Sequence, residues 1–301
     1  MKKWLIFVGL ALLTALVACG GQPSGGNGGG GGSLDPRDVA AALGSAGEQT
    51  NRLAQSLSGA GVPVPVVAMP FSSGVAPLDT STWNCDAVTA SGDLTDADGD
   101  NIPVSATLNG RCTWSYNGGE ESFHGYWEYD NLKVEDPSDT DPAAGIKASG
   151  KITWGFTSES GSLTMTWTIE KHDFVKQGSG FNFAYKGTWE ANTDEESFSF
   201  NYDYSGTLTP DDMEDPWGNG TMSATGSFGV GPGNGCTNGW SVEFTLTNVH
   251  FATCGVDGGS ADFTFNDCEG GSCTITIAWH GCSDATYGGT CMELPTSQEI
   301  H

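Results

Sequence analysis

A strict alternation of apolar and polar residues, repeated in many segments beyond about residue 82, constrains the fold of this 301-residue chain most strongly. In SLTMTWTI, Leu163, Met165, Trp167 and Ile169 alternate with threonines, and the pattern recurs in FSFNYDY (198–204), VEFTLT (242–247) and TITIAW (274–279). Successive side chains of a strand point to opposite faces of its sheet. A period of two, rich in Thr and aromatic residues, is therefore typical of half-buried β-strands.

Turn signals and the spacing of these segments indicate how the strands connect. Asn-Gly pairs, which favour tight hairpin turns, begin at Asn109, Asn117, Asn219, Asn234 and Asn238. No helical pattern of useful length separates the segments, which argues against a parallel sheet. We therefore predict a mainly β fold over about residues 82–294: an antiparallel, meander-rich sandwich or one large curved sheet. Four tryptophans follow the core-facing period: Trp154, Trp167, Trp189 and Trp279.

The segment before the strands has a different pattern. Asp35 and Pro36 are suited to the N-cap and first position of a helix, and a narrow apolar stripe follows, so we predict one short helix over 34–60 that packs on the β domain. Residues 61–81 are rich in proline and predict an extended connector. Residues 295–301 are polar and are expected to form a C-terminal tail.

The first residues have the pattern of an export signal. Lys2 and Lys3 precede the apolar run 4–17, which ends in LVAC, with Cys19 followed by Gly20. This resembles the lipobox of bacterial lipoproteins. The resemblance implies that residues 1–18 are a signal peptide, that Cys19 carries acyl chains such as palmitate, and that Gly20 favours the outer membrane. Glycine dominates residues 19–33, which we predict to be a flexible tether between the lipid anchor and the folded part.

The charge of the chain limits its partners. Asp and Glu number 37 against 11 Lys and Arg, for a formal net charge of −26. So acidic a chain is not expected to bind nucleic acid or to adhere to anionic lipid headgroups, and it favours divalent cations as counterions. The expected membrane contact is therefore the lipid on Cys19.

Nine cysteines are present, and eight remain for disulfides once Cys19 is lipidated: Cys85, Cys112, Cys236, Cys254, Cys268, Cys273, Cys282 and Cys291. An even number in an exported chain indicates up to four disulfides. Sequence proximity favours the pairs Cys268–Cys273, Cys282–Cys291, Cys85–Cys112 and Cys236–Cys254, although the connectivity does not follow from sequence. A zinc site is less favoured because no CxxC spacing occurs.

The loop TDADGDNIP, residues 95–103, is the sharpest chemical signal. Alternating Asp96, Asp98 and Asp100 can direct several carboxylates at one hard cation, with Asn101 and Asp93 as further oxygen donors. The loop resembles the calcium-binding loops of thrombospondin type 3-like repeats, although the chain has Val at 104, where a further Asp would complete the site. The resemblance implies one structural calcium. A solvated, Asp-rich turn is the alternative. Two other acidic runs, 135–142 and 211–216, are expected to be exposed loops, with metal contact a lesser alternative.

No motif for catalysis is present: GxSxG and HExxH are both absent. Glu128 lies beside aromatic residues in HGYWEYDN and is the candidate acid of a glycan-active enzyme, and Trp114, Trp127 and Trp217 are candidate surface contacts for a ligand. We expect a non-catalytic binding or structural role at the cell envelope, with glycan, lipid or an envelope protein as partner. A carbohydrate-binding module, a glycan-active enzyme and a carrier of hydrophobic cargo remain alternatives.

Overall fold

The computed structural model describes residues 81–291, apart from 85, 101, 118–121, 159–160, 195–196, 214–218, 232–239, 268–270 and 283. The predicted signal peptide, the lipidated Cys19, the tether, the helix over 34–60, nearly all of the connector and the C-terminal tail lie outside these residues. Within the described part, no helix has the length and apolar character needed to cross a membrane.

The described residues form thirteen strands: β1 (Ser81–Asn84), β2 (Thr89–Asp93), β3 (Ser105–Asn117), β4 (Ser122–Glu135), β5 (Gly145–Ser158), β6 (Gly161–Gln177), β7 (Gly180–Thr193), β8 (Ser197–Pro210), β9 (Gly220–Gly231), β10 (Trp240–Ala252), β11 (Gly255–Asp267), β12 (Ser272–Gly281) and β13 (Asp284–Gly289).

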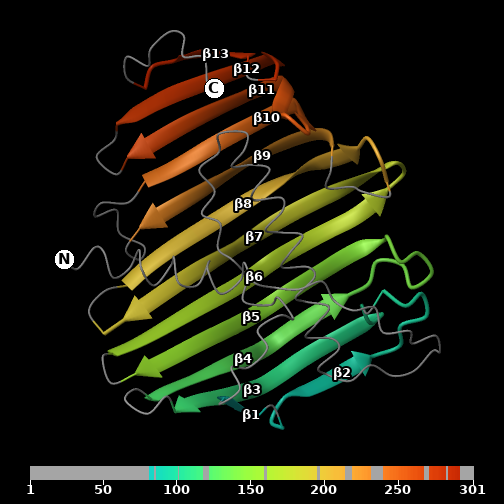
Figure 1. The fold of residues 1–301 in the computed structure, drawn as a ribbon, viewed down its shortest axis with the longest axis vertical. Coiled ribbons are helices and arrows are strands. Elements are labelled where there is room, and N and C mark those ends of the chain that lie inside the picture. Colours follow the sequence, from blue (N-terminus) through green and yellow to red (C-terminus); the bar gives the residue numbers. More distant parts are fainter. Residues whose placement is uncertain are drawn as a thin grey trace.

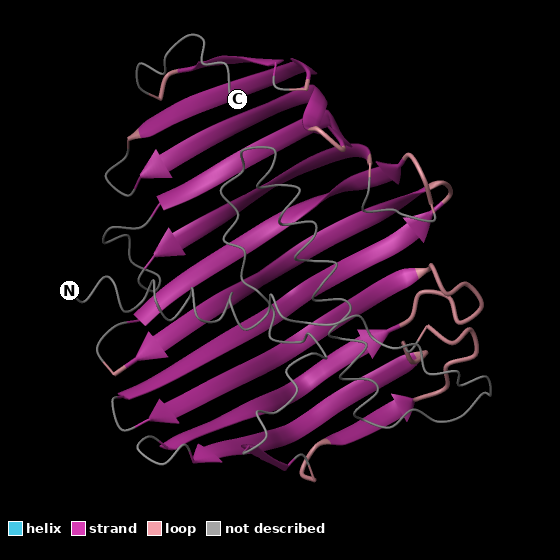
Figure 2. Ribbon diagram, viewed as in Figure 1, coloured by secondary structure: helices cyan, strands magenta, loops and turns pink. Residues whose placement is uncertain are grey.

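These strands make one open antiparallel sheet (Figures 1 and 2). From β3 onward each strand pairs with the next one in the sequence, while β1 and β2 both pair with β3 at one edge and β13 forms the other edge. The predicted antiparallel meander is confirmed. Of the two predicted forms, the described strands adopt the large single sheet and not the two-sheet sandwich.

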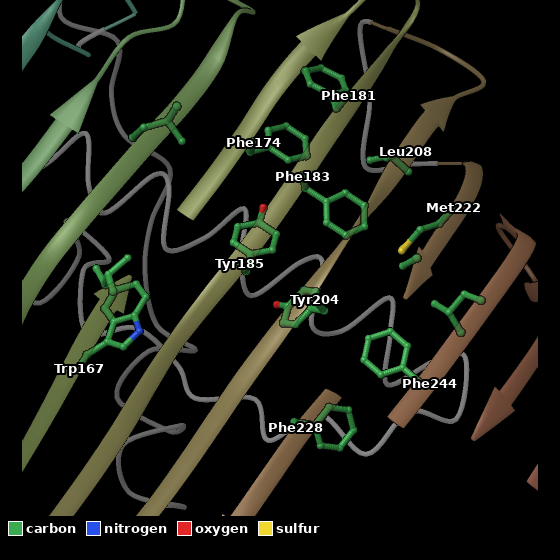
Figure 3. Packing of buried hydrophobic residues seen from close by; sticks show 14 of the residues in the cluster. Trp167, Phe174, Phe181, Phe183, Tyr185, Tyr204, Leu208, Met222, Phe228 and Phe244 are labelled. Atoms are coloured by element: carbon green, nitrogen blue, oxygen red, sulfur yellow. The ribbon is translucent and has the colours of Figure 1, made fainter. Parts of the chain in front are cut away.

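The predicted alternation separates the sheet into an apolar face and a polar face. On β8, Phe200, Tyr204 and Leu208 are buried, whereas Asn201 and Asp203 between them are exposed. The buried side chains form one continuous cluster that extends from the start of β3 to β12. Figure 3 shows its aromatic centre, with rings from β6, β7, β8, β9 and β10 side by side.

Glycines on the apolar face make room for the rings of neighbouring strands. A Cβ added at Gly125 would lie 2.2 Å from the Trp114 ring, and one at Gly226 would lie 2.2 Å from the Tyr204 side chain. Because the glycines leave space, Trp114 approaches Phe156 on the second strand along, with ring centroids 6.1 Å apart. The aromatic layer is thus packed across strands as well as along them.

A line of β-bulges crosses β3 to β6. The pairing register shifts between Leu108 and Gly110 on β3, at 130–133 on β4, 148–150 on β5 and 169–171 on β6. Bulges bend a strand and increase its twist. The prediction of a hairpin turn at Asn109-Gly110 is therefore wrong: Gly110, with φ of 114°, lies inside β3 at its bulge.

The meander places alternate connections at opposite ends of the strands. We call the end with the connections after β2, β4, β6, β8, β10 and β12 rim A, and the other end rim B. Rim A carries most of the polar chemistry described below.

Candidate metal centre

Two acidic loops meet at rim A, where β3 begins and β4 ends. One is residues 94–104, between β2 and β3, and the other is residues 136–144, between β4 and β5. They are neighbours because Ser105 and Glu135 are paired in the β3–β4 hairpin. The backbone N–H of Ala97 donates to Oδ1 of Asp139 at 2.8 Å, and that of Asp136 donates to the carbonyl of Pro103 at 3.1 Å.

Within the loops, one oxygen of each acid supports the local turn. Oδ1 of Asp96 accepts from Gly99 N–H at 2.7 Å, and Oδ1 of Asp100 accepts from Ile102 N–H, also at 2.7 Å. In the other loop, Oδ1 of Asp136 accepts from the backbone two residues on, at 2.9 Å. Ile102 is itself a buried member of the core, so the first loop is fixed to the sheet.

The second oxygens of three of these acids are buried without hydrogen-bond donors. These atoms are Oδ2 of Asp98, Asp100 and Asp136. Ligand oxygens of the three carboxylates lie within 4.8 Å of one another. Asp98 also belongs to a second such group, with Asp96 and Asp139. Burying carboxylate oxygens without donors is unfavourable unless a cation or a proton compensates them.

The pKa values reflect this crowding. Burial, together with the neighbouring Asp98 and Asp136 carboxylates, raises the pKa of Asp100 to about 7. Burial likewise raises the pKa values of Asp98 and Asp136, and the charges of nearby carboxylates act in the same direction. The cluster therefore tends to hold protons unless a cation replaces them.

The donor set is suited to a hard divalent cation. All five acids offer carboxylate oxygens, and Ca²⁺ takes six to eight oxygen ligands at about 2.3–2.6 Å in flexible geometry. Mg²⁺ requires a stricter octahedron, and Zn²⁺ in structural sites prefers Cys and His. The chemistry of these donors therefore fits calcium best.

The predicted ligands are only part of this cluster. Asp98 shares one group with Asp96 and the other with Asp100, but Asp93 is outside both groups, and its Oδ1 accepts from the backbone and hydroxyl of Thr95. Asn101 lies outside the described residues. Sequence analysis gave the run 135–142 the role of an exposed loop, yet its Asp136 and Asp139 complete the two groups and are only partly exposed. The position of these two acids follows from the pairing register of the β3–β4 hairpin and not from a sequence motif.

The predicted ligand contacts on β3 and β4 lie on both faces of the sheet. Trp127 packs on the apolar face with its ring centroid 6.3 Å from that of Trp154, whereas Glu128 points to the polar face. There Glu128 forms an ion pair with Arg111, whose guanidinium lies 4.1 Å from the centroid of the Tyr126 ring. Trp114 is on the apolar face as well, and Trp217 lies outside the described residues.

Three of the predicted disulfide pairings are wrong. Cys254 is bonded to Cys282, and Cys273 is bonded to Cys291, with Cα–Cα distances of 5.8 and 4.7 Å. These bonds exclude the predicted pairs Cys268–Cys273, Cys282–Cys291 and Cys236–Cys254. The meander is the cause: the β10–β11 and β12–β13 turns lie next to each other at rim A, and the start of β12 faces the end of β13 at rim B.

Of the eight disulfide candidates, Cys85, Cys236 and Cys268 lie outside the described residues, while Cys112 is disulfide-bonded. Cys254, Asp257 and Cys282 also come close enough together for metal ligands. Because their sulfurs are joined in a disulfide, these two cysteines do not offer a metal site.

A histidine links three elements at rim A near that disulfide. His250 on β10 contacts Asp257 on β11 through Nδ1 and Asp211, after β8, through Nε2 at 3.2 Å. The hydrogen bonds to these two carboxylates, Asp257 first, raise the pKa of His250. Sequence reasoning missed this cluster because its members are distant in the chain.

In comparisons with known proteins, no protein-family model, curated protein or solved structure matches the chain. The site must therefore be interpreted from its own geometry.

Proposed function

We propose that this chain is a lipid-anchored protein of the cell envelope with a non-catalytic role, and that the two acidic loops at rim A bind a structural calcium ion. One observation carries the calcium proposal: Asp98, Asp100 and Asp136 bring carboxylate oxygens within 4.8 Å of one another, and each has a buried Oδ2 without a hydrogen-bond donor. A divalent cation would satisfy all three at once.

A structural role agrees best with the position of the cluster. Its ligands come from two loops that border the β3–β4 hairpin, close to the edge of the sheet formed by β1 and β2. An ion bound there would hold the two loops together against the mutual repulsion of their acids. The loop acids also engage backbone donors, as expected of residues that shape a binding loop.

The anchor is proposed from the lipobox-like LVAC at Cys19 and the Gly-rich tether, with the outer membrane as the expected location. A glycan site receives no support from β4, because Trp127 and Glu128 point to opposite faces. Hydrophobic cargo would have to occupy the apolar face of the sheet.

Native mass spectrometry of the chain from an oxidising compartment, with calcium in the buffer, tests the metal site. We expect one calcium mass on the wild type and its loss in Asp98→Asn, because Asp98 belongs to both ligand groups. The matched control is Asp262→Asn, which removes an exposed acid from the polar face of β11 and should leave calcium in place. A calcium-free wild type would contradict the proposal.

Fatty-acid labelling in bacterial cells tests the anchor separately. We expect the wild type to incorporate label and to fractionate with membranes, and Cys19→Ala to lose both properties. Unlabelled wild-type protein would contradict the anchor without affecting the calcium site.

A further inference from the structure

The apolar face of the sheet is buried although the described strands form a single layer. Leu108 on β3, Val242 on β10 and Ala261 on β11 are each 0% exposed. In the described residues, close strand packing is between hydrogen-bonded neighbours of the sheet. The ring contacts agree, since those among the described residues join strands at most two positions apart, as Tyr204 on β8 and Phe244 on β10 do.

One layer of strands does not bury its own face. A sheet that is apolar on one side has to place that side against another layer. Bending at the bulges brings side chains closer together, but it does not supply a second layer. Something that is not among the described strands must therefore cover the face.

We propose that the cover is the preceding part of the same chain, residues 34–80. It joins the sheet directly, because β1 begins at Ser81 on one edge. Crossing the twelve strands of the main path takes about 50 Å at the usual strand spacing of about 4.8 Å. A helix over 34–60 has a length of about 40 Å, and the extended residues that follow have a reach of about 60 Å. The segment is therefore long enough to span the face.

The composition of this segment matches the face it would cover. Residues 53–78 contain no Asp, Glu, Lys or Arg, in a chain whose net charge is −26. They do contain a run of apolar residues, VPVPVVAMPF at 62–71. In so acidic a chain, an uncharged stretch of this length with an apolar run is expected to be buried and not exposed to water.

Burial on the face also suggests where the cover lies. On β6, Leu163 and Met165 near rim B are only partly buried, while Ile169 and Phe174 toward rim A are buried. On β8, Phe198 at the rim B end is 48% exposed. The cover therefore lies over the middle and the rim A half of these strands.

Charge substitutions in the full chain test the inference. Phe71→Asp places an acid in the apolar run, and we expect the melting temperature to fall by about 5 °C or more and ANS emission to rise at least about twofold. Ser73→Asp adds the same charge two residues on and should change both readings far less, because its side chain is already polar. Equal, small effects of the two substitutions would overturn the inference.

Cleavage provides a second readout that does not depend on a destabilised variant. A protease site inserted between Asp79 and Thr80 allows the segment to be cut from the folded, calcium-loaded protein. We expect the two fragments to remain together on gel filtration, because the apolar contact persists without the peptide bond. The control is the same insertion within the glycines at 28–32, where the released piece should separate.

Three results, one with the cut protein and two with the uncut protein, would overturn the inference. One is a released segment with an unchanged sheet fragment and no increase in ANS binding. A second is a dimer of the uncut protein, which would assign the face to a second copy. A third is a co-purified lipid in the native mass spectrum of the uncut protein, which would assign the face to hydrophobic cargo.

Discussion

The two edges of this sheet differ in the chemistry gathered at them. At the β10–β13 edge, Cys254–Cys282 joins two turns at rim A and Cys273–Cys291 joins β12 to the chain after β13 at rim B. At the β1–β5 edge, Cys112 is also disulfide-bonded, but the loops that meet at rim A bring carboxylates together as well. Disulfides constrain an edge whether or not calcium is present, whereas clustered carboxylates repel one another unless a cation or protons neutralise them.

This difference suggests a division of labour. The terminal strands of a sheet lack a neighbour on one side and open most easily, so both edges need added constraints. The cysteine edge, β10–β13, is expected to depend on redox conditions, and the acidic edge, β1–β5, is expected to depend on calcium in addition to its Cys112 disulfide. Each dependence can be removed separately, as the following predictions describe.

Removing the disulfides should have the largest effect. The two bonds close loops of 28 and 18 residues, for which chain entropy predicts about 3 kcal/mol of stability each. Cys254→Ser with Cys282→Ser, combined with Cys273→Ser and Cys291→Ser, should therefore cost about 6 kcal/mol in urea unfolding. The response of the protein to calcium should persist, because the acidic loops are unchanged. An unaffected unfolding midpoint would contradict the role given to this edge.

Calcium removal should come second. At calcium about a hundredfold above Kd, binding adds about 3 kcal/mol, which corresponds to about 6–12 °C in Tm for a domain of this size. We expect chelation to lower the Tm of the wild type by that amount, as followed by circular dichroism. Asp98→Asn should melt at one temperature with or without calcium, and the Asp262→Asn control should behave as the wild type.

The pH dependence of the calcium-free protein should sharpen the comparison further. The pKa of Asp100 is about 7 in the folded protein, above the ordinary aspartate value of 3.8. The folded state therefore binds more protons than the unfolded state between these values, and stability should fall as the pH rises from about 4 to about 7. Asp100→Asn should flatten this slope in urea unfolding under chelation. A slope that is equally steep in the variant would show that Asp100 is not the origin of this pH dependence.

His250 should give the smallest effect, near the cysteine edge. Its pKa is raised by Asp257 and Asp211, so the added stability is present below the unfolded pKa of about 6.5 and is lost as the pH rises through the folded value. Because the side chain is partly exposed, we expect less than about 1 kcal/mol. His250→Gln should remove this pH dependence without altering calcium binding, which denaturation at several pH values would measure.

Local sequence patterns were sufficient for the strands and insufficient for the contacts between distant loops. The period of two assigned Trp167 and Phe200 to the apolar face correctly, because alternation is a property of each strand alone. The spacing of Asp96, Asp98 and Asp100 likewise indicated potential ligands, since Asp98 shares one ligand group with Asp96 and another with Asp100.

Asp136 and Asp139 could not be assigned in this way, because their place beside the first loop depends on the register of β3 with β4. The disulfide pairings were predicted wrongly for the same reason. Proximity in sequence favoured Cys282–Cys291, whereas the meander places Cys282 beside Cys254. The lesson is that alternate connections of a meander meet at one rim, and residues there should be considered together.

The most direct test of the account is a calcium titration by isothermal calorimetry of the wild type and of Asp136→Asn. Asp136 belongs to the cluster only because the two loops meet. Its substitution therefore tests whether both loops bind the ion, and leaves the Asp-rich motif of the loop 94–104 unchanged. We predict calcium binding by the wild type, weakened at least about tenfold in Asp136→Asn. Equal affinities would show that the loop 94–104 binds alone, and an absence of heat in both would contradict the metal centre.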